Sequence, residues 1–189
     1  MKKFIVAILL MAGMTAFAQT GHMTFKGVPI DGNLSSFVSK LKQKGFTVLH
    51  SEKGTAVLKG DFASYKNCMV GVYEHESGNV NRVAVMFPEK DTWARLYGDY
   101  SKLKEMLTEK YGEPTSIEQF QETSYNMDDN DRMHEVRMDR CQYVSAWVTD
   151  KGMIELRIDH QIMIGCMVVL MYGDAENEAK VRSSAIDDL

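Results

Sequence analysis

The sequence lacks the short motifs that identify most catalytic and metal-binding sites. It contains no CxxC spacing, no HExxH zinc motif, no GxSxG nucleophile elbow and no glycine-rich phosphate loop. Metal coordination and nucleophilic catalysis both need several side chains of suitable type at convergent positions, and scattered histidines and acids do not supply them. We therefore expect a protein that is not an enzyme and that carries no cofactor and no bound metal.

The sequence also lacks an apolar run long enough to span a membrane, which takes about 20 residues. Its N-terminal apolar run, Phe4–Met14, is shorter, follows two lysines and precedes the small-residue pattern Ala16-Phe17-Ala18. This order is typical of a secretory signal peptide. We expect residues 1–18 to be removed by cleavage near Ala18, and residues 19–189 to form a single domain that is periplasmic or secreted.

Cysteine is scarce, with three residues in the chain. The first, Cys68, lies far from the predicted cleavage point, so we expect no lipid tether there. An oxidising compartment permits disulfides, but three cysteines form at most one intramolecular bridge, and the pairing among Cys68, Cys141 and Cys166 stays open. Each lies in or beside an apolar stretch, where a free thiol commonly acts as a small buried hydrophobic group.

Positive charge is in deficit as well. The chain has 22 Lys and Arg against 26 Asp and Glu, a net charge of −4, and removal of a signal peptide with two lysines makes it more acidic. Nucleic acids and anionic membrane surfaces both bind proteins through clustered Lys and Arg. We expect no nucleic acid among the partners and no stable membrane insertion.

Turn residues and hydrophobic periodicity divide the rest of the chain into helices and strands. Apolar residues at helical spacing predict a helix capped by Asn33 and a longer helix over 92–111. Residues 122–140 predict a long loop with Asp128–Asp131 at its tip, and a polar helix or tail begins at Ala175. Runs of β-branched and aromatic residues predict strands near 46–51, 54–60, 67–75, 80–87, 142–149, 152–159 and 166–173.

The order of these elements, a helix followed by a meander and then the same again, predicts an α+β fold. We expect antiparallel sheet in two similar halves, packed against two main helices.

The late hairpin offers enough turn chemistry to predict its register. A three-residue loop, Asp150-Lys151-Gly152, would pair Thr149 with Met153. On one face, this register pairs apolar residues that we assign to the core. On the other face it would gather Tyr143, Ser145, Trp147, Glu155, Arg157 and Asp159.

Several turn and core residues carry a resemblance to known proteins. The string Lys110-Tyr111-Gly112-Glu113-Pro114 after a helix, and the later pattern of Trp147, Gly152, Ile154, Leu156 and Ile158 followed by Tyr172-Gly173-Asp174 and Asn177, resemble an uncharacterised family of small secreted or periplasmic proteins of gram-negative bacteria. The chain is also similar to the tandem helix-and-sheet modules of the beta-lactamase-inhibitor-protein type. This resemblance implies a protein that binds other proteins.

Two groups of potential metal ligands are present without a metal-binding pattern. His75, His134 and His160 each stand beside acids, but adjacent pairs alone do not make a zinc site. The acidic run Asp128–Asp131 offers oxygen donors for calcium, yet it lacks the glycine and the distal glutamate of an EF-hand. We interpret both groups as solvated surface residues.

Methionine is abundant, with 14 residues. Thioethers are soft ligands for Cu(I), and Met163, Met167 and Met171 recur at intervals of four. Because that spacing aligns side chains on a helix while this segment predicts a strand, we expect the methionines to fill the core.

The predicted binding residues are Tyr143, Trp147, Glu155 and Arg157, because Tyr, Trp and Arg commonly anchor interfaces. Our leading hypothesis is a non-enzymatic binding module that presents a sheet face to an unknown protein or small ligand of the cell envelope. The alternatives are a secreted hydrolase that uses a histidine and a carboxylate, and a protein that handles metal or redox equivalents.

Overall fold

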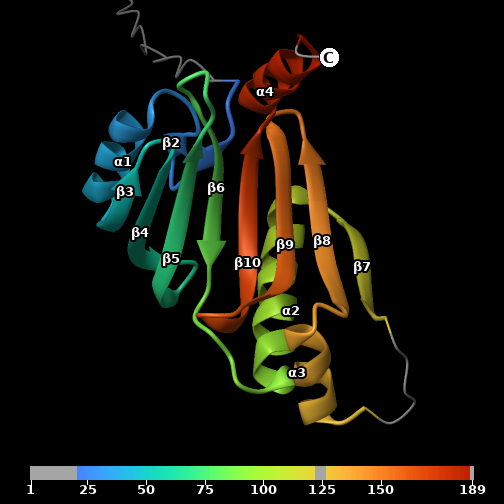
Figure 1. Cartoon of the computed structure of the whole chain (residues 1–189). Coiled ribbons are helices and arrows are strands. Elements are labelled where there is room, and N and C mark those ends of the chain that lie inside the picture. The colour runs from blue at the N-terminus through green and yellow to red at the C-terminus, as the bar shows by residue number, and fades with distance from the viewer. Residues whose placement is uncertain (1–20, 122–126, 188–189) are drawn as a thin grey trace, which may run out of the picture.

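The structure is a computed structural model that describes residues 21–121 and 127–187 (Figure 1). The predicted signal peptide lies outside the described residues. In chain order the elements are β1 (Thr24–Phe25), β2 (Val28–Pro29), α1 (Leu34–Gln43), β3 (Thr47–Glu52), β4 (Thr55–Phe62), β5 (Tyr65–Glu74), β6 (Val80–Met86), α2 (Trp93–Tyr111), β7 (Thr115–Phe120), α3 (Asp129–Arg137), β8 (Cys141–Thr149), β9 (Gly152–Gln161), β10 (Gly165–Asp174) and α4 (Ala175–Asp187).

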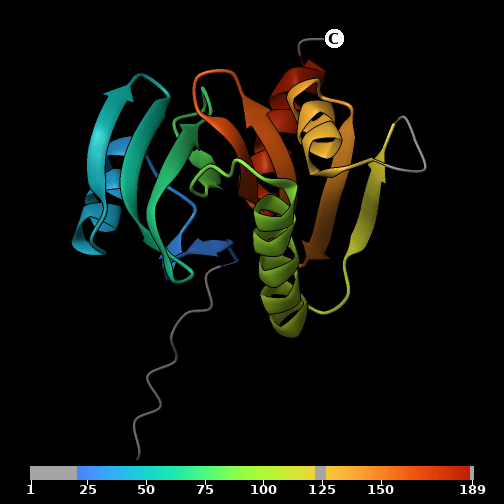
Figure 2. The same cartoon turned by 90° about the horizontal axis from the view of Figure 1, so that it is seen from below.

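Eight strands form one antiparallel sheet in the order β3-β4-β5-β6-β10-β9-β8-β7, and β1 pairs with β2 in a small separate hairpin. The strands follow one another from β3 at one edge to β7 at the other (Figure 2). Each half of the sheet follows a helix, α1 or α2, and the last strands of the two halves, β6 and β10, pair at the centre. The predicted α+β fold with two similar halves is confirmed.

Both main helices bury their apolar residues against the same face of the sheet, which we call the helix-covered face. One cross-strand row of this face runs through residues that are almost completely buried: Leu58, Val70, Val85, Leu170, Leu156 and Ser145. The opposite side, which we call the open face, carries the alternate residues of the same strands. The core therefore lies between α1, α2 and one side of the sheet.

Helix α1 forms where the sequence predicts it. The Asn33 side chain accepts a hydrogen bond from the Ser36 backbone N–H at 2.9 Å, which satisfies one of the unpaired donors of the first turn. The helix stops before Gly45, whose φ of 93° is unfavourable for residues with a side chain. Beyond it, the Phe46 N–H donates to the Leu41 carbonyl at 3.2 Å, which closes the end of the helix.

Helix α2 is capped from outside its own sequence. Thr92 precedes it but makes no side-chain capping bond. Instead, the Asp129 carboxylate accepts hydrogen bonds from the N–H groups of Trp93 at 3.0 Å and Ala94 at 3.1 Å. A carboxylate at this position also interacts favourably with the positive end of the helix dipole.

Two elements differ from the prediction. The predicted loop tip Asp128–Asp131 is the start of α3, because Asp128 and Asp131 form a reciprocal capping box. The helix pattern that follows is too short and too polar to show clear periodicity. Strand β7 was not predicted either, because it is an edge strand with exposed residues and Ile117 as its only aliphatic side chain. Among the described residues, no helix is long and apolar enough to cross a membrane.

Candidate functional site

The late hairpin has a register one residue away from the predicted one. Thr149 pairs with Gly152, so that the turn contains two residues, Asp150 and Lys151, rather than three. The pairs that follow are Val148 with Met153, Trp147 with Ile154, Ala146 with Glu155, Ser145 with Leu156 and Val144 with Arg157. A shift of one residue moves every side chain of a strand to the other face relative to its partner. The predicted pairing of Trp147 with Glu155 is therefore wrong.

The physical reason for this register lies at Gly152. Its φ is 148°, and a Cβ placed there would collide with the carbonyl oxygen of Gly173 on the neighbouring strand β10. The Thr149 hydroxyl donates to the Gly152 carbonyl at 2.9 Å and accepts from the Lys151 N–H at 3.2 Å. Gly152 is thus the first residue of the ladder and not the left-handed residue of the loop.

Two of the four predicted binding residues lie on the helix-covered face. Trp147 is 2% exposed, and its indole N–H donates to the Gly112 carbonyl at 2.8 Å. The Tyr143 ring packs within 6 Å of four other rings, those of Trp93, Tyr97, Tyr100 and Phe120. These two side chains therefore join the sheet to α2.

The other two predicted residues lie on the open face. The Arg157 guanidinium donates to the Glu155 carboxylate at 2.8 Å and to the Asp159 carboxylate at 3.0 Å. All three residues are half-buried. Partly exposed ion pairs of this kind contribute little to stability. The sequence predicted that Tyr143, Trp147, Glu155 and Arg157 share one face, whereas the sheet separates them into two pairs.

A groove of about 370 Å³ lies on the open face where α4 meets the ends of β8, β9 and β10. Its lining includes the apolar side chains of Val148, Met153 and Met171, together with Arg82 and Glu155. Val148 is 85% exposed and Met153 is 43% exposed, and the two lie directly opposite each other in the ladder. An exposed apolar pair therefore stands at one end of this groove.

Charged groups form the α4 side of the groove. The guanidinium of Arg82, on β6, donates to both oxygens of the Glu178 carboxylate, on α4, at 2.6 and 2.7 Å. The Asn81 amide donates to the same carboxylate at 2.8 Å. Burial alone would raise the pKa of Glu178, but these hydrogen bonds and the charge of Arg82 lower it below its ordinary value. Glu178 therefore stays ionised and holds α4 against β6.

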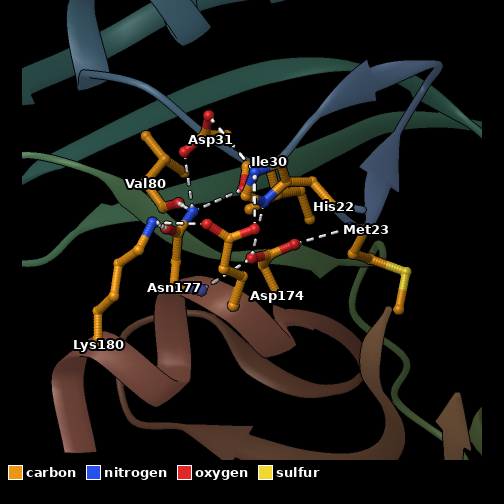
Figure 3. A network of polar contacts seen from close by, with 9 residues as sticks. His22, Met23, Ile30, Asp31, Val80, Asp174, Asn177 and Lys180 are labelled. Atoms are coloured by element: carbon orange, nitrogen blue, oxygen red, sulfur yellow. Dashed lines mark hydrogen bonds and ion pairs between the residues drawn. The ribbon is translucent and has the colours of Figure 1, made fainter. Parts of the chain in front are cut away.

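A buried polar network fastens the first turn of α4 to the N-terminal segment (Figure 3). The Asp174 side chain is fully buried and accepts from the backbone N–H groups of Met23 at 2.7 Å and Asn177 at 2.9 Å. The Asn177 amide donates to the carbonyls of Ile30 and Val80, both at 3.1 Å. Segments from both ends of the chain and from the middle therefore meet at this point.

His22 completes the network. Its imidazole Nδ1 lies 3.0 Å from the Asp174 carboxylate, and Nε2 lies 3.4 Å from that of Glu176 and 3.6 Å from that of Asp31. Burial alone would lower the pKa of His22, but the hydrogen bond to Asp174 and the three negative charges outweigh it and raise that pKa above its ordinary value.

Sequence reasoning did not predict this network. His22 drew no attention because it has no motif around it, and Asp174 and Asn177 entered only through the resemblance. Their three-residue spacing at the start of α4 is that of a helix cap, and this was the one available signal.

Another surface cavity, of about 610 Å³, is mainly charged and is lined by Glu89, Lys90, Asp91, Arg95, Arg137, Gly165 and Cys166. None of the histidines considered for catalysis, His75, His134 and His160, lines this cavity or the α4 groove. Within residues 21–121 and 127–187, His, Cys, Asp and Glu side chains form no group of three that could hold a metal ion.

The three cysteines are free thiols. Cys68 and Cys166 are buried on the helix-covered face, and burial raises the pKa of both thiols. Burial, with the neighbouring Cys166 and Glu135, raises the pKa of Cys141 to about 12. Thiols with raised pKa values are poor nucleophiles near neutral pH. This chemistry fits packing better than redox catalysis.

No family model, no curated protein and no solved structure matches the chain. The assignment of this site therefore rests on its geometry.

Proposed function

We propose that this protein is a non-enzymatic binding module of the cell envelope or the secreted fraction, and that it contacts a partner protein through the open face beside α4. The observation that carries the proposal is the exposed apolar pair of Val148 and Met153 at the end of the α4 groove. Val148 protrudes from the sheet with nearly all of its side chain in water. Contiguous apolar groups that the described residues leave exposed commonly mark a protein contact.

The surroundings of this pair have the composition of an interface. The apolar side chains of Val148, Met153 and Met171 lie between charged groups at the border of the groove, which include the Arg82–Glu178 pair. Binding surfaces commonly place apolar residues at the centre and polar residues at the rim. Of the sequence-predicted contacts, Glu155 lines the groove and Arg157 pairs with Glu155.

The geometry favours a protein over a small molecule as the partner. The groove, at about 370 Å³, is near the lower end of the range of about 300–1,000 Å³ for ligand pockets. A side chain that projects as far as Val148 fits a recess on another surface better than it encloses a small ligand. The predicted signal peptide and the resemblance to protein-binding tandem modules support the same proposal.

Site-specific photocrosslinking tests the proposal. A photoreactive residue at position 148, introduced into the full chain expressed with its own N-terminal segment, should give one discrete covalent adduct in intact cells or their medium. The matched control carries the same residue at position 49, because Leu49 is 54% exposed on the edge strand β3, far from α4 in the sheet order.

A second substitution links the adduct to the surface. Met153→Glu places a charge beside position 148 without removing a buried group and should abolish the adduct while the protein keeps its unfolding midpoint. Three outcomes would contradict the proposed contact surface. They are equal adducts at positions 148 and 49, no adduct at position 148, and an adduct at position 148 that persists with Met153→Glu.

A further inference from the structure

Charge is unevenly distributed along the chain. Residues 21–87 carry eight Lys and Arg against five Asp and Glu, whereas residues 88–189 carry 12 against 21. The net charge of the whole chain therefore conceals a basic first half and a strongly acidic second half. A local basic surface can attract anions even when the protein as a whole is acidic.

A second groove, of about 590 Å³, lies where α1 ends and β3 begins (Figure 1). We call it the lysine groove, because its charged lining consists of Lys26, Lys44, Lys59 and Asp61. The three lysines come from different elements. Lys26 lies in the turn between β1 and β2, Lys44 follows the last residue of α1, and Lys59 belongs to β4. Folding therefore brings together three cations that are separated in the sequence.

The three lysines of the groove keep their charge uncompensated. All three are exposed, and within residues 21–121 and 127–187 none of them forms an ion pair. The carboxylate of Asp61 accepts a hydrogen bond from the ammonium of Lys66, outside the lining, at 2.6 Å. This hydrogen bond is the largest cause of the lowered pKa of Asp61, which therefore stays ionised and paired. Lys66 thus balances the negative charge of Asp61.

The backbone at Lys26 is in an unfavourable conformation. Lys26 and Gly27 form the two-residue turn between β1 and β2, with φ values of 51° and 75°. Such turns favour Asn or Asp before Gly, because a positive φ is costly for most other residues. A lysine at this position weakens the turn and adds a charge to the groove. Strain of this kind is common at binding sites.

We propose that Lys26, Lys44 and Lys59 form a binding site for a phosphate-bearing polyanion. Lysine is a common phosphate ligand and acts as a point charge without a fixed geometry. Because a single exposed ion pair contributes little, three such charges around one groove suit a ligand with two or more phosphate groups. The phosphates can belong to a soluble molecule or to a lipid headgroup.

The end of α1 is the main unfavourable feature nearby, because a helix C-terminus carries partial negative charge. The carbonyls of Leu41 and Lys42 there already accept hydrogen bonds from the N–H groups of residues 44–46. The helix dipole corresponds to about half a unit charge, which is smaller than the three full charges of the lysines. The groove therefore remains attractive to an anion.

Titration of tripolyphosphate into the full chain, followed by NMR of the backbone amides, tests the site. The amides of Gly45, Gly60 and Asn67, which line the groove, should shift together and saturate, while those of α4 should not. Sodium chloride at matched ionic strength should give no saturable shift. The affinity for tripolyphosphate should fall as the salt concentration rises, because salt screens exposed charges.

Vesicles distinguish the two sources of phosphate. The arms are phosphatidylcholine vesicles with and without phosphatidic acid. Sedimentation of the protein only with vesicles that contain phosphatidic acid, together with tripolyphosphate binding, would assign the phosphates to a lipid headgroup. Binding of tripolyphosphate without sedimentation would assign them to a soluble ligand.

Charge variants test the individual residues. Lys44→Gln and Lys59→Gln should each weaken tripolyphosphate binding by about two- to fivefold. The matched control is Lys53→Gln, which should leave the affinity unchanged, because Lys53 is exposed in the turn at the other end of β3 and β4. Asp61→Asn should strengthen binding, since it removes a negative charge from the lining and keeps an oxygen that can accept from the Asn67 N–H.

The turn residue separates binding from folding. Lys26→Asn should weaken tripolyphosphate binding while it keeps or raises the unfolding midpoint, because Asn is favoured in this turn. A purely structural lysine would lower the midpoint instead. Four outcomes would overturn the proposal. They are no saturable shift, shifts spread over the whole surface, equal affinities of the Lys53→Gln and Lys59→Gln variants, and weaker binding by Asp61→Asn.

Discussion

The buried carboxylate of Asp174 accepts a hydrogen bond from the backbone N–H of Met23 at 2.7 Å, although 151 positions separate the two residues in the chain. The same carboxylate caps α4 through the Asn177 N–H. One side chain therefore determines both where the C-terminal helix begins and how it is attached to the N-terminal segment. Because α4 forms one side of the groove, this attachment also shapes the proposed contact surface.

Replacement of Asp174 should destabilise the protein strongly. Asp174→Ala removes the cap and leaves the buried Met23 N–H without its acceptor, and we expect a loss of about 2–4 kcal/mol in the free energy of unfolding. Urea denaturation measures this loss. The control is Glu176→Gln, because Glu176 lies two residues further along, in the first turn of α4, with an exposed side chain, and its change should have a much smaller effect. Equal effects of the two substitutions would contradict the central role of Asp174.

The stability of the protein should depend on pH through His22. Its pKa in the folded state is raised above the ordinary value of 6.5, so folding favours the protonated imidazole. This contribution is fully present below the unfolded pKa and is lost as the pH rises through the folded pKa. His22 faces the carboxylates of Asp31, Asp174 and Glu176, and Lys180 contacts the same network.

Comparison with His22→Gln isolates this contribution. The difference in unfolding free energy between the wild type and the variant should be larger at about pH 5.5 than at about pH 8.5. Titration of the imidazole by NMR gives the folded pKa directly. A folded pKa below 6.5, or a difference that grows as the pH rises, would show that burial outweighs the three carboxylates.

Gly152 should tolerate no side chain. Gly152→Ala places a Cβ against the Gly173 carbonyl and holds alanine at a positive φ, and we expect a loss of about 2–4 kcal/mol in unfolding free energy. Gly78→Ala is the matched control, because Gly78 also has a positive φ, of 82°, but a Cβ there meets nothing within 4 Å. Its cost should be about 1 kcal/mol. The difference between the two variants measures the close approach of β9 to β10.

Two adjacent residues test the register of the late hairpin. Trp147→Ala removes a buried indole and its hydrogen bond to Gly112, and it should cost about 3–5 kcal/mol. Val148→Ala changes a side chain that is 85% exposed and should cost less than about 0.5 kcal/mol. Chemical denaturation of both variants gives the comparison. The reverse order of effects would require the register that the sequence predicted.

Local patterns predicted most of the fold. Helix α1, helix α2 and seven strands of the large sheet lie where periodicity and turn residues place them. Both helices and the inner strands bury a continuous apolar stripe or alternate face, whereas the mostly exposed edge strand β3 was located by its β-branched residues and the turns around it. Strand β7 and helix α3 were not predicted because they lack such a pattern. Their stability comes from partners elsewhere, as when Asp129 of α3 caps α2.

The candidate site was less predictable than the fold. Alternation correctly divided the residues of β8 into two faces, and those of β9 likewise. Which face of β8 lies beside which face of β9 depends on whether the turn between them contains two or three residues. The sequence alone does not distinguish them, because Gly152 can be the last residue of a three-residue turn or the first residue of β9 after a two-residue turn. The close approach of Gly173 from β10 accounts for the observed one, and β10 is not part of the hairpin turn.

The sequence by itself determined the composition of each strand, its alternating faces and the capped start of α1, because these depend on neighbours within a few residues. Tertiary structure decided which faces meet. It buried Trp147, exposed Val148 and joined His22 to Asp174. Those relationships arise from the pairing of distant strands, and a one-residue difference in register is enough to reverse them.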